Sequence, residues 1–102
     1  MVSQDLAVIG ELPVKMIDIW INCPDLTTAQ AISSTLISEK LVASANIFPE
    51  IQSSYHWKGK VENETEVPLL VKTRKEHFDA VVARVRGLHP YETPAITGIS
   101  VD

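Results

Sequence analysis

The spacing of hydrophobic and polar residues divides the chain into segments with two different periods. Residues 14–22 are rich in strand-forming residues, with isoleucines on one face and Met16 and Trp20 on the other. Pro24 follows and ends this predicted strand. Because the strand is apolar on both faces, we expect packing partners on both sides of it.

Two later segments carry apolar residues at intervals of three and four, which is the spacing of a helix. Residues 25–41 contain Thr27-Thr28-Ala29-Gln30, a pattern typical of a capping box at a helix start. A second helix is predicted between another such pattern, Thr73-Arg74-Lys75-Glu76, and Leu88, with Gly87 as its C-cap. The first of these helices is clearly amphipathic, and the second has the clearest periodicity in the chain.

Residues 43–57 and 60–73 alternate with a period of two and are joined by Lys58-Gly59, which predicts a hairpin with a bend or bulge at Pro49. At ~3.3 Å per residue, each strand would reach roughly 45–50 Å. A domain of this size cannot cover such a hairpin with its own helices. We therefore expect its outer half to need another subunit.

A short final strand is predicted over residues 95–101. The order strand, helix, strand, strand, helix, strand is that of the ferredoxin-like α+β fold, βαββαβ, with both helices on one face of an antiparallel sheet. Residues 14–102 would form this domain and residues 1–13 an N-terminal extension. The uncovered face would be apolar, so we expect oligomerisation through it. Its predicted apolar residues are Met16, Trp20, Phe48 and Leu70.

Composition narrows the possible partners. The 102 residues are 45% hydrophobic, enough for one domain, and the net charge is -4, which gives no cationic surface for nucleic acid. The single cysteine, Cys23, is typical of a reducing compartment. Neither a signal peptide nor an apolar run of ~18 residues is present. We expect a soluble cytoplasmic protein that binds neither nucleic acid nor membranes.

Two motifs are specific enough to suggest a family: S-x-Y-x-W-x-G from Ser53 and H-P-Y-E-x-P from His89. Ala-Asn-Ile-Phe-Pro from Ala45 precedes the first motif, and Glu66 and Val71-Lys72-Thr73 lie between the two motifs. With these features, the chain resembles the CutA family of divalent-cation tolerance proteins. The resemblance implies a ferredoxin-like homotrimer, similar in architecture to the PII signal-transduction proteins, with hairpins that reach across subunits. Family members are linked to copper tolerance and bind divalent cations, and no enzymatic reaction is established for them.

The chain departs from the family pattern at two places. Ser44 stands where the family commonly has a cysteine, so a soft thiolate ligand for copper is missing. CutA chains usually continue into a segment with a Tyr and a Trp, whereas this sequence ends at Asp102, either by truncation or because its tail is short.

The resemblance and the long hairpin together predict a cleft between subunits, with Tyr55 and Trp57 of one subunit facing the His-Pro-Tyr-Glu loop of its neighbour. Tyr55 and Trp57 lie on the apolar side of their strand, so they are either interface anchors or a surface for stacking a ligand. Lys72 either forms an ion pair with a glutamate, Glu66 or Glu92, or binds an anion. The predicted cleft residues are Tyr55, Trp57, Glu66, Lys72, His89, Tyr91 and Glu92.

His89 is the one candidate metal ligand, for a divalent cation such as copper or zinc. Its ring follows a helix end and precedes Pro90, where Glu92 could orient one nitrogen while the other faces a ligand. The alternative is a loop lock, in which the ring bonds only to backbone groups. Cys23 is predicted to be a small packed residue rather than a ligand.

Three functions follow from these patterns. The leading one is a non-enzymatic trimer that binds divalent cations or small ligands and contributes to metal tolerance. The alternative is a PII-like sensor of a nucleotide or anion that acts on a protein partner, although the four glycines are dispersed and form no phosphate loop. An enzyme with His89 as general base is the third, and the sequence offers no nucleophile or paired acid for it.

Overall fold

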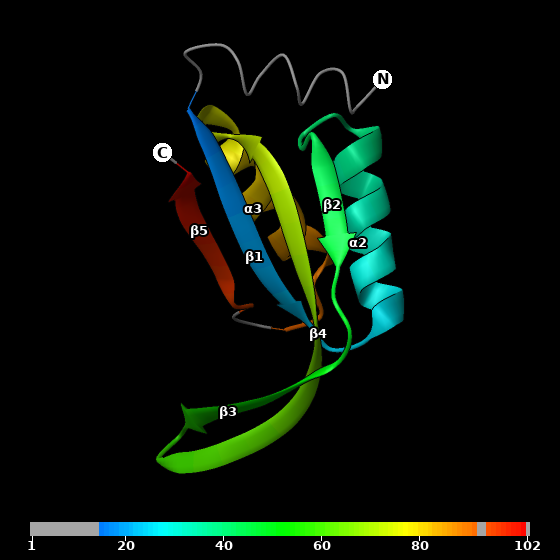
Figure 1. Ribbon diagram of the computed structural model, residues 1–102. Coiled ribbons are helices and arrows are strands. Elements are labelled where there is room, and N and C mark those ends of the chain that lie inside the picture. Colours follow the sequence, from blue (N-terminus) through cyan, green and yellow to red (C-terminus); the bar gives the residue numbers. More distant parts are fainter. Residues whose placement is uncertain (1–14, 92–93, 102) are drawn as a thin grey trace.

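The computed structural model describes residues 15–91 and 94–101 of the chain. The predicted N-terminal extension, residues 1–13, lies outside them. The elements follow the predicted order of strands and helices, with one strand divided in two (Figure 1). They are β1 (Met16–Cys23), α2 (Leu26–Ser38), β2 (Ser44–Ile47), β3 (Ile51–Trp57), β4 (Lys60–Arg74), the 3₁₀ turn η1 (Lys75–His77), α3 (Phe78–Leu88) and β5 (Ile96–Val101).

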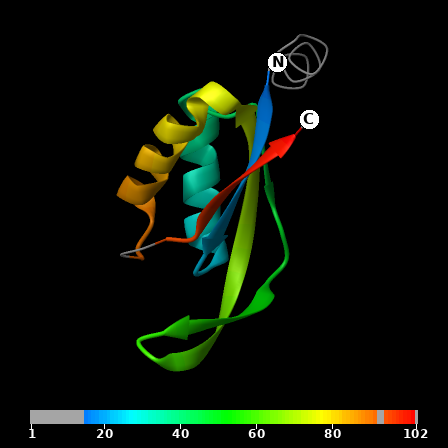
Figure 2. The same cartoon turned by 90° about the vertical axis from the view of Figure 1, so that its left-hand side faces the viewer.

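The sheet has the strand order β2-β4-β1-β5, with every neighbouring pair antiparallel. β3 pairs only with the first part of β4, beyond the end of the main sheet. Both helices lie on the same side of the sheet, as Figures 1 and 2 show. This arrangement confirms the predicted ferredoxin-like α+β fold.

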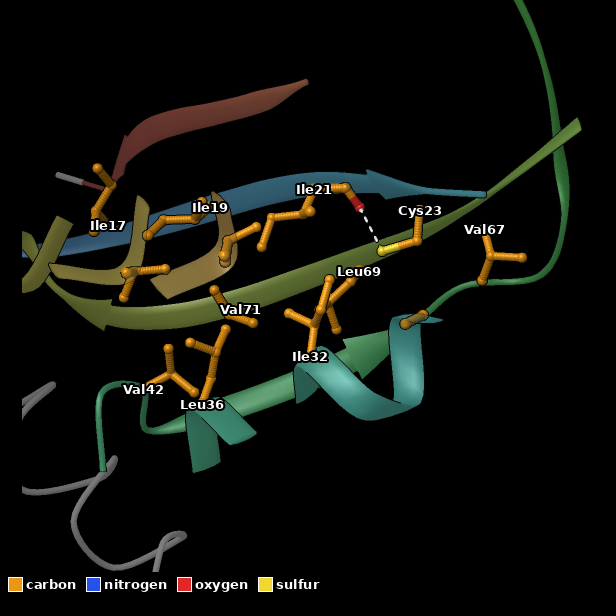
Figure 3. Close-up of a cluster of buried hydrophobic side chains, with 13 residues drawn as sticks. Ile17, Ile19, Ile21, Cys23, Ile32, Leu36, Val42, Val67, Leu69 and Val71 are labelled. Atoms are coloured by element: carbon orange, nitrogen blue, oxygen red, sulfur yellow. Dashed lines mark hydrogen bonds between the residues drawn. The ribbon is translucent and has the colours of Figure 1, made fainter. Parts of the chain in front are cut away.

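The hydrophobic core lies between the sheet and the helices (Figure 3). On β1 the burial alternates strictly, and Ile19 and Ile21 on the helix side are completely buried. They pair across the sheet with Val71 and Leu69 of β4, which are also completely buried. The predicted covering of the isoleucine face is therefore confirmed.

The predicted capping boxes are wrong at both helices. α2 is capped by Asp25, whose carboxylate accepts a hydrogen bond from the Thr28 backbone N–H at 2.7 Å. The second predicted cap, Thr73, instead donates its hydroxyl to the Leu41 carbonyl at 2.7 Å, because it is a buried residue of β4. Gly87 lies inside α3, and the C-cap is His89.

The predicted bend at Pro49 is confirmed as a break that separates β2 from β3. At the tip of the hairpin, Lys58 and Gly59 both have positive φ angles, of 51° and 77°. Two positive φ angles are those of a type I′ turn, which matches the twist of the strands it joins. Figure 2 shows the hairpin bending back below the helices.

The face of the sheet opposite the helices carries the predicted apolar residues. The Trp20 and Phe48 rings pack with their centroids 5.3 Å apart, and Phe48 is 39% exposed. An ion pair also lies on this face, with 3.2 Å between the Lys72 ammonium and the Asp18 carboxylate. The face is therefore mixed, with an aromatic pair beside a charged pair.

We expect Leu69→Ala to lower the free energy of unfolding by about 2–5 kcal/mol, because Leu69 is completely buried between β1 and the helices. Chemical denaturation followed by circular dichroism measures the change. The control is Val61→Ala, since Val61 is 61% exposed and should change the stability by less than ~0.5 kcal/mol. Equal effects of the two substitutions would contradict this account of the core.

Candidate functional site

An open cleft of about 800 Å³ lies between the β3–β4 hairpin and the loop that joins α3 to β5. Its walls combine aromatic rings with carboxylates and a few neutral polar groups. The lining residues are Asn22, Ser53, Ser54, Tyr55, Trp57, Glu62, Glu64, Glu66, Tyr91 and Ala95. A cleft of this size suits a small-molecule ligand.

The register of the hairpin places the aromatic residues of β3 beside the glutamates of β4. Tyr55 lies directly opposite Glu62, and Ser53 lies opposite Glu64. Directly opposite residues of an antiparallel pair point to the same face. The prediction that Tyr55 and Trp57 lie on an apolar side is therefore wrong for the hairpin as a whole, because alternation within one strand says nothing of the partner strand.

Tyr91 brings the α3–β5 loop to the same cleft. Its hydroxyl donates a long hydrogen bond, of 3.5 Å, to Oε2 of Glu64. Tyr55, Trp57, Glu66 and Tyr91 of one chain thus line one cavity. The sequence predicts that Tyr55 and Trp57 face the His-Pro-Tyr-Glu loop of a neighbouring subunit. In the structure, the bent hairpin brings these two residues to Tyr91 of the same chain.

His89 is 7% exposed and holds this loop in place. Its Nε2 lies 2.7 Å from the Asn22 carbonyl, which can only accept, so Nε2 carries the proton. Nδ1 then accepts a hydrogen bond from the Tyr91 backbone N–H at 3.2 Å. The two rings also pack, with their centroids 4.7 Å apart.

These bonds support the loop-lock alternative for His89. Both ring nitrogens are engaged, so a metal ion could bind the ring only by displacing the Asn22 carbonyl or the Tyr91 amide. Across residues 15–91 and 94–101, no group of three or more His, Cys, Asp and Glu side chains is placed to hold a metal ion.

Lys72 does not belong to the cleft. It pairs with Asp18 on the open face of the sheet, and not with the predicted Glu66. Glu66 is six positions away along β4, which at ~3.3 Å per residue is about 20 Å. The other predicted partner, Glu92, lies outside the described residues.

Asn22 is a cleft residue that the sequence pattern does not predict. Its carbonyl accepts from His89, and its side-chain oxygen accepts from the Trp20 indole N–H at 2.8 Å. The sequence feature that could have indicated it is a polar residue at the end of a predicted apolar strand. Glu62 and Glu64 were likewise recognised only as the polar side of their strand, because their approach to Tyr91 depends on the bend of the hairpin.

Both tyrosines of the cleft have a raised pKa. Burial, followed by the negative charges of Glu66 and Glu64, raises the pKa of Tyr91 to about 12. The pKa of Tyr55 is raised as well, by desolvation and by a hydrogen bond to Glu64. Both phenols are therefore neutral hydrogen-bond donors at physiological pH, in a cleft of negative potential.

Cys23 lies next to this region and is completely buried, as predicted. Its thiol donates to the Ile21 carbonyl at 3.9 Å (Figure 3). Burial and the nearby Asp25 and Glu66 charges raise the pKa of the thiol to about 11. Since the thiolate is the form that binds metals, Cys23 is a poor ligand in this state.

Comparison with known proteins assigns the family. The sequence model of one family, described as CutA1 divalent ion tolerance protein, matches residues 17–102. The chain belongs to the CutA1 family. Among curated relatives, the divalent-cation tolerance protein CutA of Archaeoglobus fulgidus is 43% identical over 82% of this chain and 81% of its own length.

A second relative, the protein CutA homolog of Xenopus laevis, is 40% identical over 81% of this chain. The chain spans only 55% of that relative's length, about half of it. Among solved structures, the periplasmic divalent cation tolerance protein CutA from Archaeoglobus fulgidus has a TM-score of 0.83 at 40% identity, covering 85% of this chain and 84% of that one. These matches confirm the family that the motifs indicated.

Titration of the phenols tests the electrostatics of this cleft, because Tyr55 and Tyr91 are the only two tyrosines of the chain. We expect Glu64→Gln and Glu66→Gln each to lower the pKa of Tyr91 from about 12, since each removes a negative charge that opposes the phenolate. Ultraviolet absorption of phenolate in a Tyr55→Phe background measures Tyr91 alone.

Glu76→Gln is the matched control for this titration, because Glu76 lies on η1 outside the cleft. A raised pKa also means that the stability contributed by the neutral Tyr91 is lost as the pH rises from about 10 to about 12. Unchanged phenol titration in both cleft variants would show that the glutamates do not face Tyr91.

Proposed function

We propose that this chain is a non-enzymatic, homotrimeric cation-binding protein that contributes to divalent-cation tolerance. The observation that carries the proposal is the row of glutamates in the cleft, Glu62, Glu64 and Glu66, next to the polar Ser53 and Asn22. The names of the relatives, which refer to divalent-cation tolerance, support the same function. Carboxylates both raise the local cation concentration and provide oxygen ligands.

The cleft favours cations that keep part of their water shell. One or two carboxylates together with water molecules are a usual ligand set for a hard divalent ion, and zinc also accepts carboxylate oxygen. Copper(I), which prefers soft ligands, is less well served, since Ser44 replaces the family cysteine and the Cys23 thiol is protonated at neutral pH. We therefore expect divalent ions to bind, copper(II) at least as tightly as zinc.

The negative cleft argues against the alternative of an anion or nucleotide sensor. A phosphate group would meet three carboxylates in the same cavity, and Lys72, the cation proposed for it, is paired with Asp18 elsewhere. We infer that the small ligand is a cation.

The trimer is supported by the open face of the sheet. Trp20 and Phe48 pack there, and Phe48 is 39% exposed. Burial of this face against other copies of the chain would cover the aromatic pair. It would also place the clefts near subunit boundaries, where a neighbour could complete them.

We further propose that the protein acts in the cytoplasm, as the single reduced cysteine indicates. None of the described helices is long and apolar enough to cross a membrane. The Archaeoglobus fulgidus structure is named as a periplasmic protein, so fractionation of cells that express the full-length protein is the direct test.

Calorimetric titration with zinc, copper and magnesium tests the cation proposal. We expect saturable zinc binding that weakens at least about tenfold in the double variant Glu64→Gln/Glu66→Gln, because each lost carboxylate removes a charged oxygen ligand. The matched control is Glu76→Gln, with an exposed carboxylate outside the cleft. Zinc binding that survives the double substitution would move the site elsewhere.

Sedimentation equilibrium tests the assembly. We expect a species of three times the 11.3 kDa chain mass at micromolar concentration. Leu70→Glu should shift it to the monomer, because Leu70 lies on the open face between Trp20 and Asn46 and a charge there would be buried by neighbouring subunits. Ala83→Glu, at an exposed position of α3, is the control. A monomeric unmodified protein would refute the trimer.

A further inference from the structure

Glu66 has little exposed surface and lines the cleft, and its carboxylate has no partner among the described residues. It is 6% exposed and lines the cavity. Within residues 15–91 and 94–101, no hydrogen bond or ion pair involves its carboxylate. Its oxygens are not among the fully buried polar atoms, so the carboxylate is open to the cleft. Glutamates with so little exposed surface are usually paired with a positive charge. The position therefore points to a ligand that brings positive charge into the cleft.

The glutamates form a row and do not converge on one point. Glu62, Glu64 and Glu66 are alternate residues on one face of β4, so successive members are separated by roughly 6.6 Å along the strand. A single metal ion holds its oxygen ligands at about 2.0–2.6 Å and could engage only part of such a row. A ligand that matches the whole row needs several positive charges spaced along a chain.

Aromatic rings form the rest of the cleft wall. Tyr55 and Trp57 lie on β3 on the same face as the glutamates, and Tyr91 closes the cleft from the α3–β5 loop. Aromatic faces attract ammonium groups and also pack against methylene groups. A hydrated inorganic ion gains little from such walls.

The protein already places an ammonium group over one of these rings. The Lys58 Nζ lies 5.7 Å from the centroid of the Trp57 ring, at the tip of the hairpin. This distance is within the range of a cation–π interaction. An alkylammonium is thus a group that the aromatic wall accepts in the present structure.

From these four observations we propose that the cleft binds a linear aliphatic polyamine. Successive ammonium groups would lie beside the carboxylates of the β4 row, and the methylene segments between them would pack on Tyr55, Trp57 and Tyr91. An ammonium beside Glu66 would supply the partner that its carboxylate lacks among the described residues. The inference concerns an organic ligand and goes beyond the proposed metal binding, although both use the same carboxylates.

Calorimetric titration with butylamine, putrescine, spermidine and spermine tests this proposal at about 0.15 M salt, where surface charges are largely screened beyond ~8 Å. We expect affinity to rise with the number of ammonium groups. Putrescine should bind more tightly than magnesium, which carries the same charge without methylene groups. Equal affinity for putrescine and magnesium would overturn the proposal, since binding would then depend on the charge of the ligand alone and not on its methylene groups.

Two sets of variants distinguish the contribution of the glutamates to spermine binding from that of the aromatic rings. Glu66→Gln and Glu64→Gln should each weaken spermine binding at least about tenfold, with Glu76→Gln as the control outside the cleft. Trp57→Leu should weaken spermine but leave zinc binding unchanged, because only the organic ligand uses the ring. Circular dichroism confirms that each variant is folded.

The outcomes distinguish this proposal from the proposed function. Zinc binding without spermine binding would refute the polyamine site and leave the metal function standing. Spermine binding that is insensitive to Glu66→Gln and Trp57→Leu would place the polyamine outside the cleft. If spermine fails to bind and Glu66→Gln alters the sedimentation of the assembly, a cation of a second copy of the chain occupies the cleft instead.

Discussion

The antiparallel pairing of β4 with its neighbours is the constraint on which the rest of this structure depends. The second part of β4 pairs with β1 on one side and β2 on the other, and its helix-facing residues form the core together with those of β1. The first part pairs with β3 alone and carries the glutamates of the cleft. Because both parts belong to one continuous strand, the packing of core residues such as Leu69 also fixes the positions of the glutamates in the cleft.

A second connection runs from β1 to the loop after α3. The Asn22 carbonyl at the end of β1 accepts from His89, and the other ring nitrogen of His89 accepts from the Tyr91 amide. Tyr91 is thereby held at the mouth of the cleft by bonds that originate in the sheet. The histidine that the sequence offered as a metal ligand thus acts as a structural link, and the chemistry of the cleft comes from carboxylates and aromatic rings.

The charge distribution differs between the cleft and the open face of the sheet. On the open face, Lys72 and Asp18 compensate each other, and the aromatic pair Trp20–Phe48 lies beside them, as expected for a surface that packs against other protein. In the cleft, the carboxylate of Glu66 has no such partner among the described residues. The pKa values of Tyr55 and Tyr91 are raised there, first by desolvation and then by the neighbouring glutamates. A surface of the first kind suits assembly and one of the second kind suits a cationic ligand.

The sequence by itself determined the fold, because periodicity is a local property: the two-residue alternation of the strands, the helical spacing after Asp25 and Thr73, and the break at Pro49 each concern adjacent residues. It also determined the family, through motifs that need no geometry. The tertiary structure alone decided the partners. Lys72 pairs with Asp18 and not with Glu66, and Thr73 bonds to Leu41 and caps no helix, because strand pairing brings together residues that are far apart in sequence. The bend of the hairpin likewise brings Tyr91 of the α3–β5 loop to Glu64 of β4.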